Sequence, residues 1–243
     1  MHMKDFLKKY PPIFNFLRIV YKFIYRNVIK NKSVYFITSS SKPISNMYGF
    51  DRGKPLDRHY IENFLENNKR DVRGTCLELL NDEYTKKYGG ARVTKNVILD
   101  IEKENSKATL ISDLRNLSEI KDDTFDCIIL TQVLQFIDDV DMAISECHRT
   151  LKPGGVMLVT VPSISRIDCS SGEKGDFWRF TTASAHFLFE KKFKKKNVLV
   201  NSFGNARIGL YFYAGLAEED TPKKLFNQND ANFPLIITVK ATK

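Results

Sequence analysis

The chain has 243 residues, of which 42% are hydrophobic and 28% are charged. This composition excludes a disordered chain and is typical of one globular domain with an appendage, or of two small domains. Its 38 Lys and Arg residues against 29 Asp and Glu residues give a formal net charge of +9, which favours an anionic partner such as a nucleic acid, a membrane surface or a phosphorylated ligand.

The first 42 residues form a basic N-terminal extension with an amphipathic stretch. Residues 13–30 are rich in large apolar side chains, but Arg18, Lys22, Arg26 and Lys30 interrupt them every four residues. These charges exclude a transmembrane helix and a secretory signal. We expect a helix that packs on the rest of the protein or on a second subunit of a homodimer, or one that lies on an anionic membrane surface.

The basic excess is confined to this extension. Residues 1–42 hold nine basic residues and one acid, a net charge of +8, whereas residues 43–243 hold 29 basic and 28 acidic residues, a net charge of +1. This distribution predicts an anionic membrane as the partner of the extension and no nucleic-acid partner.

The cysteines argue against a metal site and against secretion. None of the four, Cys76, Cys127, Cys147 and Cys169, belongs to a C-x-x-C pair. We therefore predict no metal and a reducing, cytoplasmic location, with peripheral attachment to the inner membrane face as an option.

Residues 43–72 lead into the main domain. The segment GFDRGKPLDRHYIENFL (49–65) begins as a loop, and Asp57 is expected to cap a helix that starts near Arg58. We expect this lead-in to cover an acceptor site.

From residue 73 onward, short apolar runs alternate with helical patterns. A helix is expected at residues 140–151, followed by Lys-Pro-Gly-Gly as a stop. The alternation predicts a doubly wound α/β sheet. The strand-like runs are 75–80, 96–101, 108–114, 125–133, 156–162, 197–203 and 234–240.

Acidic and polar residues stand late in these runs or directly after them. In an open parallel sheet, ligands bind beyond the carboxyl ends of the strands. Acids there suit ribose hydroxyls and an adenine amino group, although a single acid can also cap a helix. The residues are Glu78, Asp100, Asp113, Thr131, Gln132 and Ser163.

The stretch FDCIILTQVLQFIDDVDMAISECHRTLKPGGVMLVTVP (125–162) resembles the class I S-adenosylmethionine-dependent methyltransferases, type 11-like, and the resemblance covers about residues 70–240. It implies a seven-stranded Rossmann-like domain at residues 73–243 with S-adenosylmethionine as cofactor. By the resemblance, Glu78 belongs to the first cofactor motif, Asp100 contacts the ribose and Asp113 lies by the adenine. Further cofactor contacts are expected from Leu80, Tyr84, Leu114, Thr131 and Gln132.

A narrower resemblance concerns the acceptor. The segments GFDRGKPLDRHYIENFL, LELLNDEYTKKYGG and GDFWRFT look like a bacterial subgroup that accompanies glycosyltransferases in surface-polysaccharide loci. The implied reaction is O-methylation of a sugar or a lipid-linked glycan.

One departure from the family concerns its glycine-rich loop, E-x-G-x-G-x-G. In this chain the positions read Glu78-Leu79-Leu80-Asn81-Asp82-Glu83-Tyr84, without a glycine. Side chains restrict the backbone there, and the added acids are unfavourable for a cofactor carboxylate. The alternative is therefore a non-catalytic scaffold that keeps the fold. Motifs of dinucleotide dehydrogenases, P-loop proteins and α/β-hydrolases are absent from the sequence.

The acceptor site is expected near the loop at residues 163–181 and the lead-in. Ser163, Trp178, Arg179 and Arg52 are the predicted substrate-binding residues, and His59 and Asp51 are candidates for catalysis. Trp178 could instead hold the loop to the core. Thr181 is expected to cap the next helix.

Overall fold

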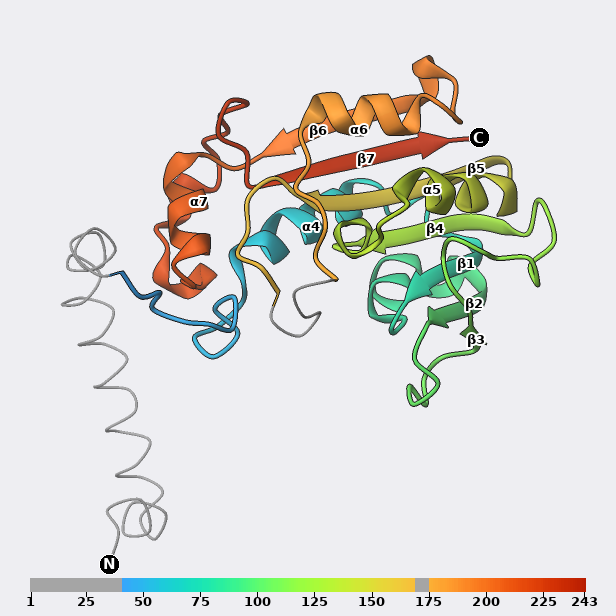
Figure 1. Cartoon of the computed structure of the whole chain (residues 1–243), viewed down its shortest axis with the longest axis horizontal. Helices are drawn as coiled ribbons and strands as arrows, with labels where there is room; N and C mark the ends of the chain where they lie inside the picture. Colours follow the sequence, from blue (N-terminus) through green and yellow to red (C-terminus); the bar gives the residue numbers. More distant parts are fainter. Residues whose placement is uncertain (1–40, 169–174) are drawn as a thin grey trace, which may run out of the picture.

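The computed structural model describes residues 41–168 and 175–243. A seven-stranded sheet forms its centre, with the strand order β3-β2-β1-β4-β5-β7-β6 (Figure 1). Strand β7 runs antiparallel to both neighbours, β5 and β6, and the remaining pairs are parallel. The strands are β1 (Gly74–Leu79), β2 (Val93–Asp100), β3 (Leu110–Ile111), β4 (Phe125–Thr131), β5 (Leu151–Pro162), β6 (Val198–Phe203) and β7 (Ile236–Thr242).

Helices cover both faces of the sheet, which confirms the predicted doubly wound α/β fold. Helices α5 and α6 lie on one face, and α4 lies on the other, where α7 also packs (Figure 1). The α-helices are α4 (Leu56–Asn67), α5 (Val140–Thr150), α6 (Thr182–Phe189) and α7 (Ala206–Tyr213). The short helices are the π-helix η2 (Thr85–Gly89) and the 3₁₀ turns η3 (Gly90–Arg92), η4 (Leu134–Phe136), η5 (Lys195–Asn197), η6 (Glu218–Asp220) and η7 (Lys223–Leu225).

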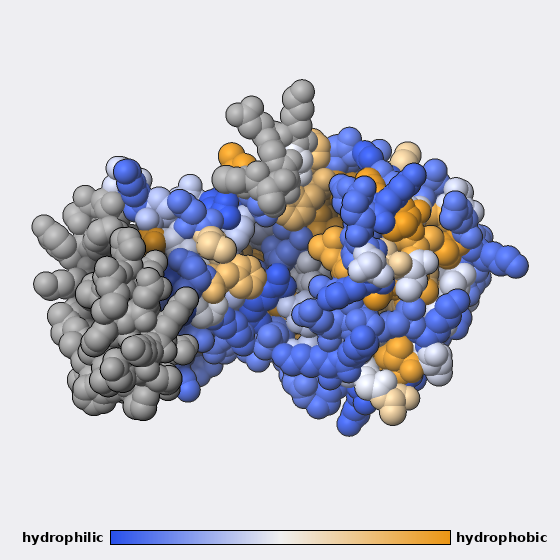
Figure 2. Space-filling model, turned by 90° about the horizontal axis from the view of Figure 1, so that it is seen from below, coloured by the Kyte–Doolittle hydropathy of each residue, from blue (hydrophilic) through white to orange (hydrophobic). Residues whose placement is uncertain are grey.

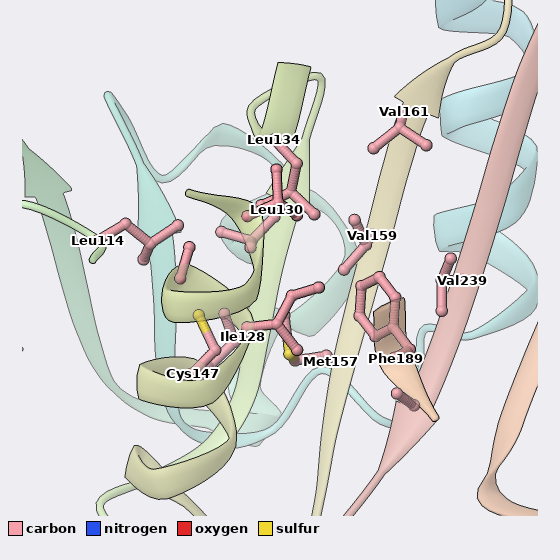
Figure 3. Packing of buried hydrophobic residues seen from close by; sticks show 14 of the residues in the cluster. Leu114, Ile128, Leu130, Leu134, Cys147, Met157, Val159, Val161, Phe189 and Val239 are labelled. Carbon is pink, nitrogen blue, oxygen red and sulfur yellow. The ribbon is translucent and has the colours of Figure 1, made fainter. Parts of the chain in front are cut away.

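Successive side chains of the central strands point to opposite faces of the sheet, and this divides the hydrophobic core into two layers. In β4, Ile128 and Leu130 pack toward α5, whereas Cys127 and Ile129 pack with α4 on the opposite face. Figure 3 shows the first layer, in which Cys147 of α5 lies beside Ile128. Because each fully buried large side chain contributes about 1.5–3 kcal/mol, this two-sided burial holds the strand ends in fixed positions.

The helix ends confirm two predictions and correct one. The predicted helix at 140–151 is α5, and Thr181 caps α6 by accepting a hydrogen bond from the Ser184 amide at 3.1 Å. The expected cap at Asp57 is wrong, because α4 begins at Leu56, two residues before Arg58, and Pro55 occupies its N-cap position. Proline lacks an N–H and has a fixed φ, so it fits a helix start without a side-chain cap.

The lead-in packs against the chain that follows α7. The Ile44 amide donates to the Ala214 carbonyl at 2.8 Å, and Pro55 forms an isolated bridge with Ala217. Gly215 has φ +80°, and a Cβ there would lie 2.2 Å from the Ser45 carbonyl oxygen. The glycine therefore permits both the left-handed end of α7 and the close approach of the lead-in.

The predicted amphipathic helix at residues 13–30 and Cys169 lie outside the described residues. Within the described ranges, none of the helices has the length and apolar character needed to cross a lipid bilayer.

Candidate functional site

A pocket of about 1040 Å³ opens at the carboxyl ends of β1, β2 and β4. Figure 2 views the molecule from the β3 edge of the sheet and shows a hollowed surface with hydrophilic and hydrophobic side chains around it. All eight residues predicted to contact the cofactor line this pocket: Glu78, Leu80, Tyr84, Asp100, Asp113, Leu114, Thr131 and Gln132. The sheet topology thus brings together residues that are up to 54 positions apart in the sequence.

Asp100 ends β2 as a buried carboxylate with defined partners. Its Oδ1 accepts from the Glu102 amide at 3.0 Å, and its Oδ2 accepts from Asn105 Nδ2 at 2.6 Å. The same Asn105 amide donates to the Leu80 carbonyl at 2.8 Å. A carboxylate has about four acceptor sites, so Asp100 is held in place and can still accept hydrogen bonds from a ligand.

Asp113 is paired with a cation that the sequence prediction missed. Arg115 Nε donates to Asp113 Oδ1 at 3.0 Å, and its Nη2 donates to Oδ2. This bidentate contact lowers the pKa of Asp113, so the carboxylate stays charged. Arg115 also binds Asp138. Arg115 therefore connects Asp113, after β3, with the segment before α5 along one wall of the pocket.

Glu78 organises the loop that has lost its glycines. Its two carboxylate oxygens accept from the amides of Tyr84 at 3.1 Å and Thr85 at 2.7 Å. Burial raises the pKa of Glu78, although these two amides oppose the shift. A glutamate in β1 thereby fixes the start of η2 and brings Tyr84 into the pocket wall.

Two residues of the pocket wall have a left-handed backbone although neither is glycine. Leu80 has φ +67° and Gln132 has φ +55°. Such conformations are strained for side-chain-bearing residues and are concentrated at functional sites. Leu80 stands at the family's first glycine position, so the loop keeps its backbone turn without the glycine.

The lead-in and the loop after β5 complete the pocket from above the strand ends. Lys54 and Lys87 both contact Glu62, at 3.0 Å and 3.2 Å. Partial burial favours protonation of Glu62, but these ammonium groups outweigh it and lower its pKa. Phe50 and Phe177 add half-exposed aromatic rings.

The structure places the candidate residues of the lead-in outside the pocket wall. Asp51 accepts from Ser45 Oγ at 2.5 Å, and Arg52 forms a bidentate pair with Asp220 at 2.8 Å and 3.0 Å. His59 packs against Phe226 with tilted rings whose centroids lie 4.2 Å apart, and its Nδ1 lies 3.3 Å from Glu218. The contacts of Arg52 and His59 attach the lead-in to the segment after α7, and that of Asp51 lies within the lead-in. All three side chains therefore have partners within the protein.

The predicted substrate-binding residues after β5 also have internal partners and do not line the pocket. Ser163 donates its amide to the Leu235 carbonyl at 2.9 Å. Trp178 donates its indole N–H to the Ile137 carbonyl at 2.8 Å, which supports the packing interpretation of this side chain. Arg179 binds the Asp176 carboxylate at 2.6 Å and 2.8 Å and the Arg166 carbonyl at 2.7 Å.

Several pocket residues were not identified from the sequence. Arg58 and Glu62 share one face of α4, while Tyr60, Ile61 and Phe64 are buried in the core. The spacing of four residues places Arg58 and Glu62 on the same polar side of an amphipathic helix, but it does not show that this side meets the pocket. Other missed residues are Phe50, Lys54, Lys87, Arg115, Phe136, Ile137, Asp138 and Phe177.

Known proteins share this arrangement. Residues 73–159 match the model of a family described as "Methyltransferase domain". This part of the chain is therefore similar to a methyltransferase domain. The match includes β1 to β4 and most of β5, and therefore the strand ends that form the floor of the pocket.

Two curated relatives match parts of this domain. A Mycolicibacterium smegmatis protein, named a probable S-adenosylmethionine-dependent methyltransferase, is 33% identical over 110 residues, which cover 43% of this chain and 40% of that protein. The ubiquinone biosynthesis O-methyltransferase of Mesorhizobium japonicum is 34% identical over 64 residues, 26% of this chain and 22% of its own length. The chain thus spans less than half the length of each relative.

Solved structures share the fold at low sequence identity. An S-adenosylmethionine-dependent methyltransferase from Mesorhizobium loti aligns with a TM-score of 0.52 and 14% identity, over 77% of this chain and 98% of that one. The N-methyltransferase NodS from Bradyrhizobium japonicum, in complex with S-adenosyl-L-homocysteine, aligns with a TM-score of 0.50 and 11% identity, over 88% and 98%. At these identities the likeness concerns the fold alone.

Proposed function

We propose that this chain is an S-adenosylmethionine-dependent methyltransferase that methylates a hydroxyl group of a sugar or a lipid-linked glycan in surface-polysaccharide biosynthesis. One observation carries the proposal of a cofactor site. The eight predicted cofactor residues, from β1, β2, β4 and the loops that follow β1, β3 and β4, line a single pocket at the carboxyl ends of the strands.

The pocket residues suit an adenosyl ligand. Asp100 would accept from the ribose hydroxyls, and Asp113 lies beside Leu114 where an adenine would fit between apolar side chains. Gln132 supplies a buried Nε2 donor that has no hydrogen-bond partner among the described residues. A buried donor without a partner is costly, so it favours a bound acceptor atom.

The bound cofactor would supply a methyl group on a positively charged sulfur. The contribution of this chain is to hold the two reactants in line, which is worth up to roughly 7–11 kcal/mol in ideal cases. Asp100 and Asp113 are fixed by Asn105 and Arg115, and their orientation therefore costs little on binding. The lead-in and Phe177 cover the strand ends and reduce the access of water.

Three observations support a sugar hydroxyl as acceptor. The volume of about 1040 Å³ is at the upper end of the roughly 300–1,000 Å³ of small-molecule sites, which leaves space for a second ligand. Phe50 and Phe177 offer aromatic faces on which a sugar ring could stack. The curated relative from Mesorhizobium japonicum is named an O-methyltransferase, which agrees with transfer to oxygen.

The test is titration calorimetry with S-adenosylmethionine. We expect binding by the wild type and about tenfold or weaker binding by Asp100→Asn, because charged hydrogen bonds of about 1.5–3 kcal/mol are lost. Asp82→Asn is the matched control, since Asp82 lies in the same region, pairs with Lys86 and Asn96, and does not line the pocket.

Two results would contradict parts of this proposal. If a folded wild type releases no heat on titration with S-adenosylmethionine at high micromolar concentration, the non-catalytic scaffold is favoured. The loss of three loop glycines is the sequence feature that agrees with that alternative. Equal affinity of wild type and Asp100→Asn would remove the assignment of Asp100 to the ribose. Methyl transfer to a purified glycan fraction would then test the acceptor class.

A further inference from the structure

The guanidinium of Arg58 is a pocket cation without a direct salt bridge in the described part of the chain, although the Asp57 and Glu62 carboxylates lie near enough to favour its charge. Its Nη1 donates to the Tyr84 hydroxyl at 2.8 Å, and no salt bridge joins Arg58 to any described residue. Burial disfavours its charged form, but Asp57 and Tyr84 outweigh burial and raise the pKa of Arg58, so the group stays protonated. A partly buried cation with a single neutral hydrogen-bond partner is suited to an incoming anion.

The other cations of the pocket wall differ in this respect. Lys54 pairs with Glu62 and Glu218, Lys87 pairs with Glu62, and Arg115 is bound by Asp113 and Asp138. Their charges are already neutralised within the protein, so they have less to gain from a ligand carboxylate.

The position of Arg58 indicates which part of the proposed cofactor it would meet. Asp113 follows β3 at one edge of the sheet, and Asp100 ends β2, so the adenine and the ribose would occupy that side of the pocket. The opposite end of the ligand would extend over β1 and β4, toward α4. Arg58 and Tyr84 line the pocket there, and Tyr84 stands at the family's third glycine position.

We propose that Arg58 binds the α-carboxylate of the amino-acid end of S-adenosylmethionine and thereby replaces the close backbone contact that loop glycines permit. The inference rests on the proposed function. The glycine-free loop places Glu83 in the pocket wall, and its negative charge would repel a carboxylate. A planar guanidinium can bind a carboxylate through two parallel hydrogen bonds and offset this repulsion.

The experiment compares two ligands that differ only in this carboxylate. Calorimetry measures the affinity of S-adenosylmethionine and of decarboxylated S-adenosylmethionine for the full-length wild type and for Arg58→Met. We expect the wild type to prefer the carboxylated ligand about tenfold or more, and Arg58→Met to bind both nearly equally. Arg58→Lys should restore part of the preference, because it keeps the charge and loses the bidentate geometry.

Lys86→Met is the matched control. It removes one positive charge from the neighbouring helix η2, at a residue that pairs with Asp82 and does not line the pocket, and should keep the preference for the carboxylated ligand. The proposal is overturned if Arg58→Met weakens both ligands by the same factor, or if the wild type itself does not distinguish them. The second outcome needs no variant and stays decisive should Arg58→Met fail to fold.

A failure of the proposed function would give a different pattern. In that case neither ligand would bind, and 5′-methylthioadenosine, which lacks the whole amino-acid part, would not bind either. Binding of 5′-methylthioadenosine with equal affinity by wild type and Arg58→Met, together with loss of the carboxylate preference, is the pattern expected when both proposals are correct.

Discussion

Single residues compensate for the missing glycines of the loop after β1. The Glu78 carboxylate accepts hydrogen bonds from the amides of Tyr84 and Thr85. Leu80 adopts the left-handed backbone conformation that glycine would adopt without strain. The Leu80 side chain is 58% exposed, so little packing energy offsets this strain. The loop therefore keeps its backbone conformation at a cost in the free energy of folding. Such strain is a common feature of binding sites.

Leu80→Gly should stabilise the protein. The left-handed conformation costs a residue with a side chain roughly 1–2 kcal/mol, and the larger chain entropy of glycine offsets about 0.5–1 kcal/mol of the gain. We expect the free energy of unfolding to rise by about 0.5–1 kcal/mol in urea denaturation. Leu80→Ala keeps the strain and serves as control, and a Leu80→Gly protein no more stable than Leu80→Ala would contradict the argument.

At the scale of elements, an ion pair in the loop after β5 positions Phe177 at the pocket. The Asp176 carboxylate binds Arg179 and also accepts from the Asp168 amide at 2.9 Å, while the Phe177 amide donates to the Gln135 carbonyl at 2.8 Å. Arg179 and Trp178 thus contribute to the site by holding this loop, a different role from the substrate binding that the sequence suggested.

The stability of this loop should depend on pH. The Arg179 guanidinium lowers the pKa of Asp176. The ion pair therefore stabilises the folded state above the ordinary aspartate value of about 3.9, and this contribution is lost as the pH falls through the lower, folded-state pKa. Asp176→Asn should reduce the free energy of unfolding by about 1–3 kcal/mol at pH 7.

Urea denaturation from pH 7 into acid, as far as both proteins stay folded, checks this prediction. The difference between wild type and Asp176→Asn should shrink below about pH 3.9. Asp122→Asn is the control, because Asp122 pairs with Arg149 but is 72% exposed, and exposed pairs contribute about 0–1 kcal/mol. A difference for Asp176→Asn that is independent of pH would refute the role of the charge.

At the scale of the whole molecule, the charge of the chain is unevenly divided. The net charge of +8 belongs to residues 1–42, nearly all of which lie outside the described residues, and the remaining 201 residues carry a net charge of +1. Basic residues beside apolar ones favour anionic membrane surfaces, with about 1 kcal/mol for each cation near the surface. A lipid-linked acceptor would be reached most readily from such a surface.

Deletion of residues 1–42 should abolish binding to anionic vesicles. Co-sedimentation with phosphatidylglycerol vesicles should retain the full chain at low salt and release it at high salt, whereas neutral phosphatidylcholine vesicles serve as control. The thermal unfolding of the shortened chain would verify that the α/β domain is intact. Retained binding of the shortened chain would refute a membrane role for the extension.

The sequence by itself located the strands, although not their bounds, since β3 is Leu110–Ile111 against the predicted run 108–114, and it located the acids that stand late in them or after them. Apolar runs and turn residues are local patterns, and the carboxyl ends of parallel strands meet at one edge whatever the details of packing. Glu78, Asp100, Asp113 and Thr131 therefore line the pocket as their positions in the strands implied.

Only the tertiary structure decided which side chains of the covering segments enter the pocket. In the lead-in, the sequence pointed to Arg52 and His59. Arg52, in the loop before α4, pairs with Asp220, and on α4 His59 lies toward Glu218 whereas Arg58 lines the pocket. The orientation of a helix depends on its buried face and on partners more than 150 residues away, such as Phe226 beside His59. No local pattern contains those partners, so packing decides which basic residue of the lead-in lines the pocket.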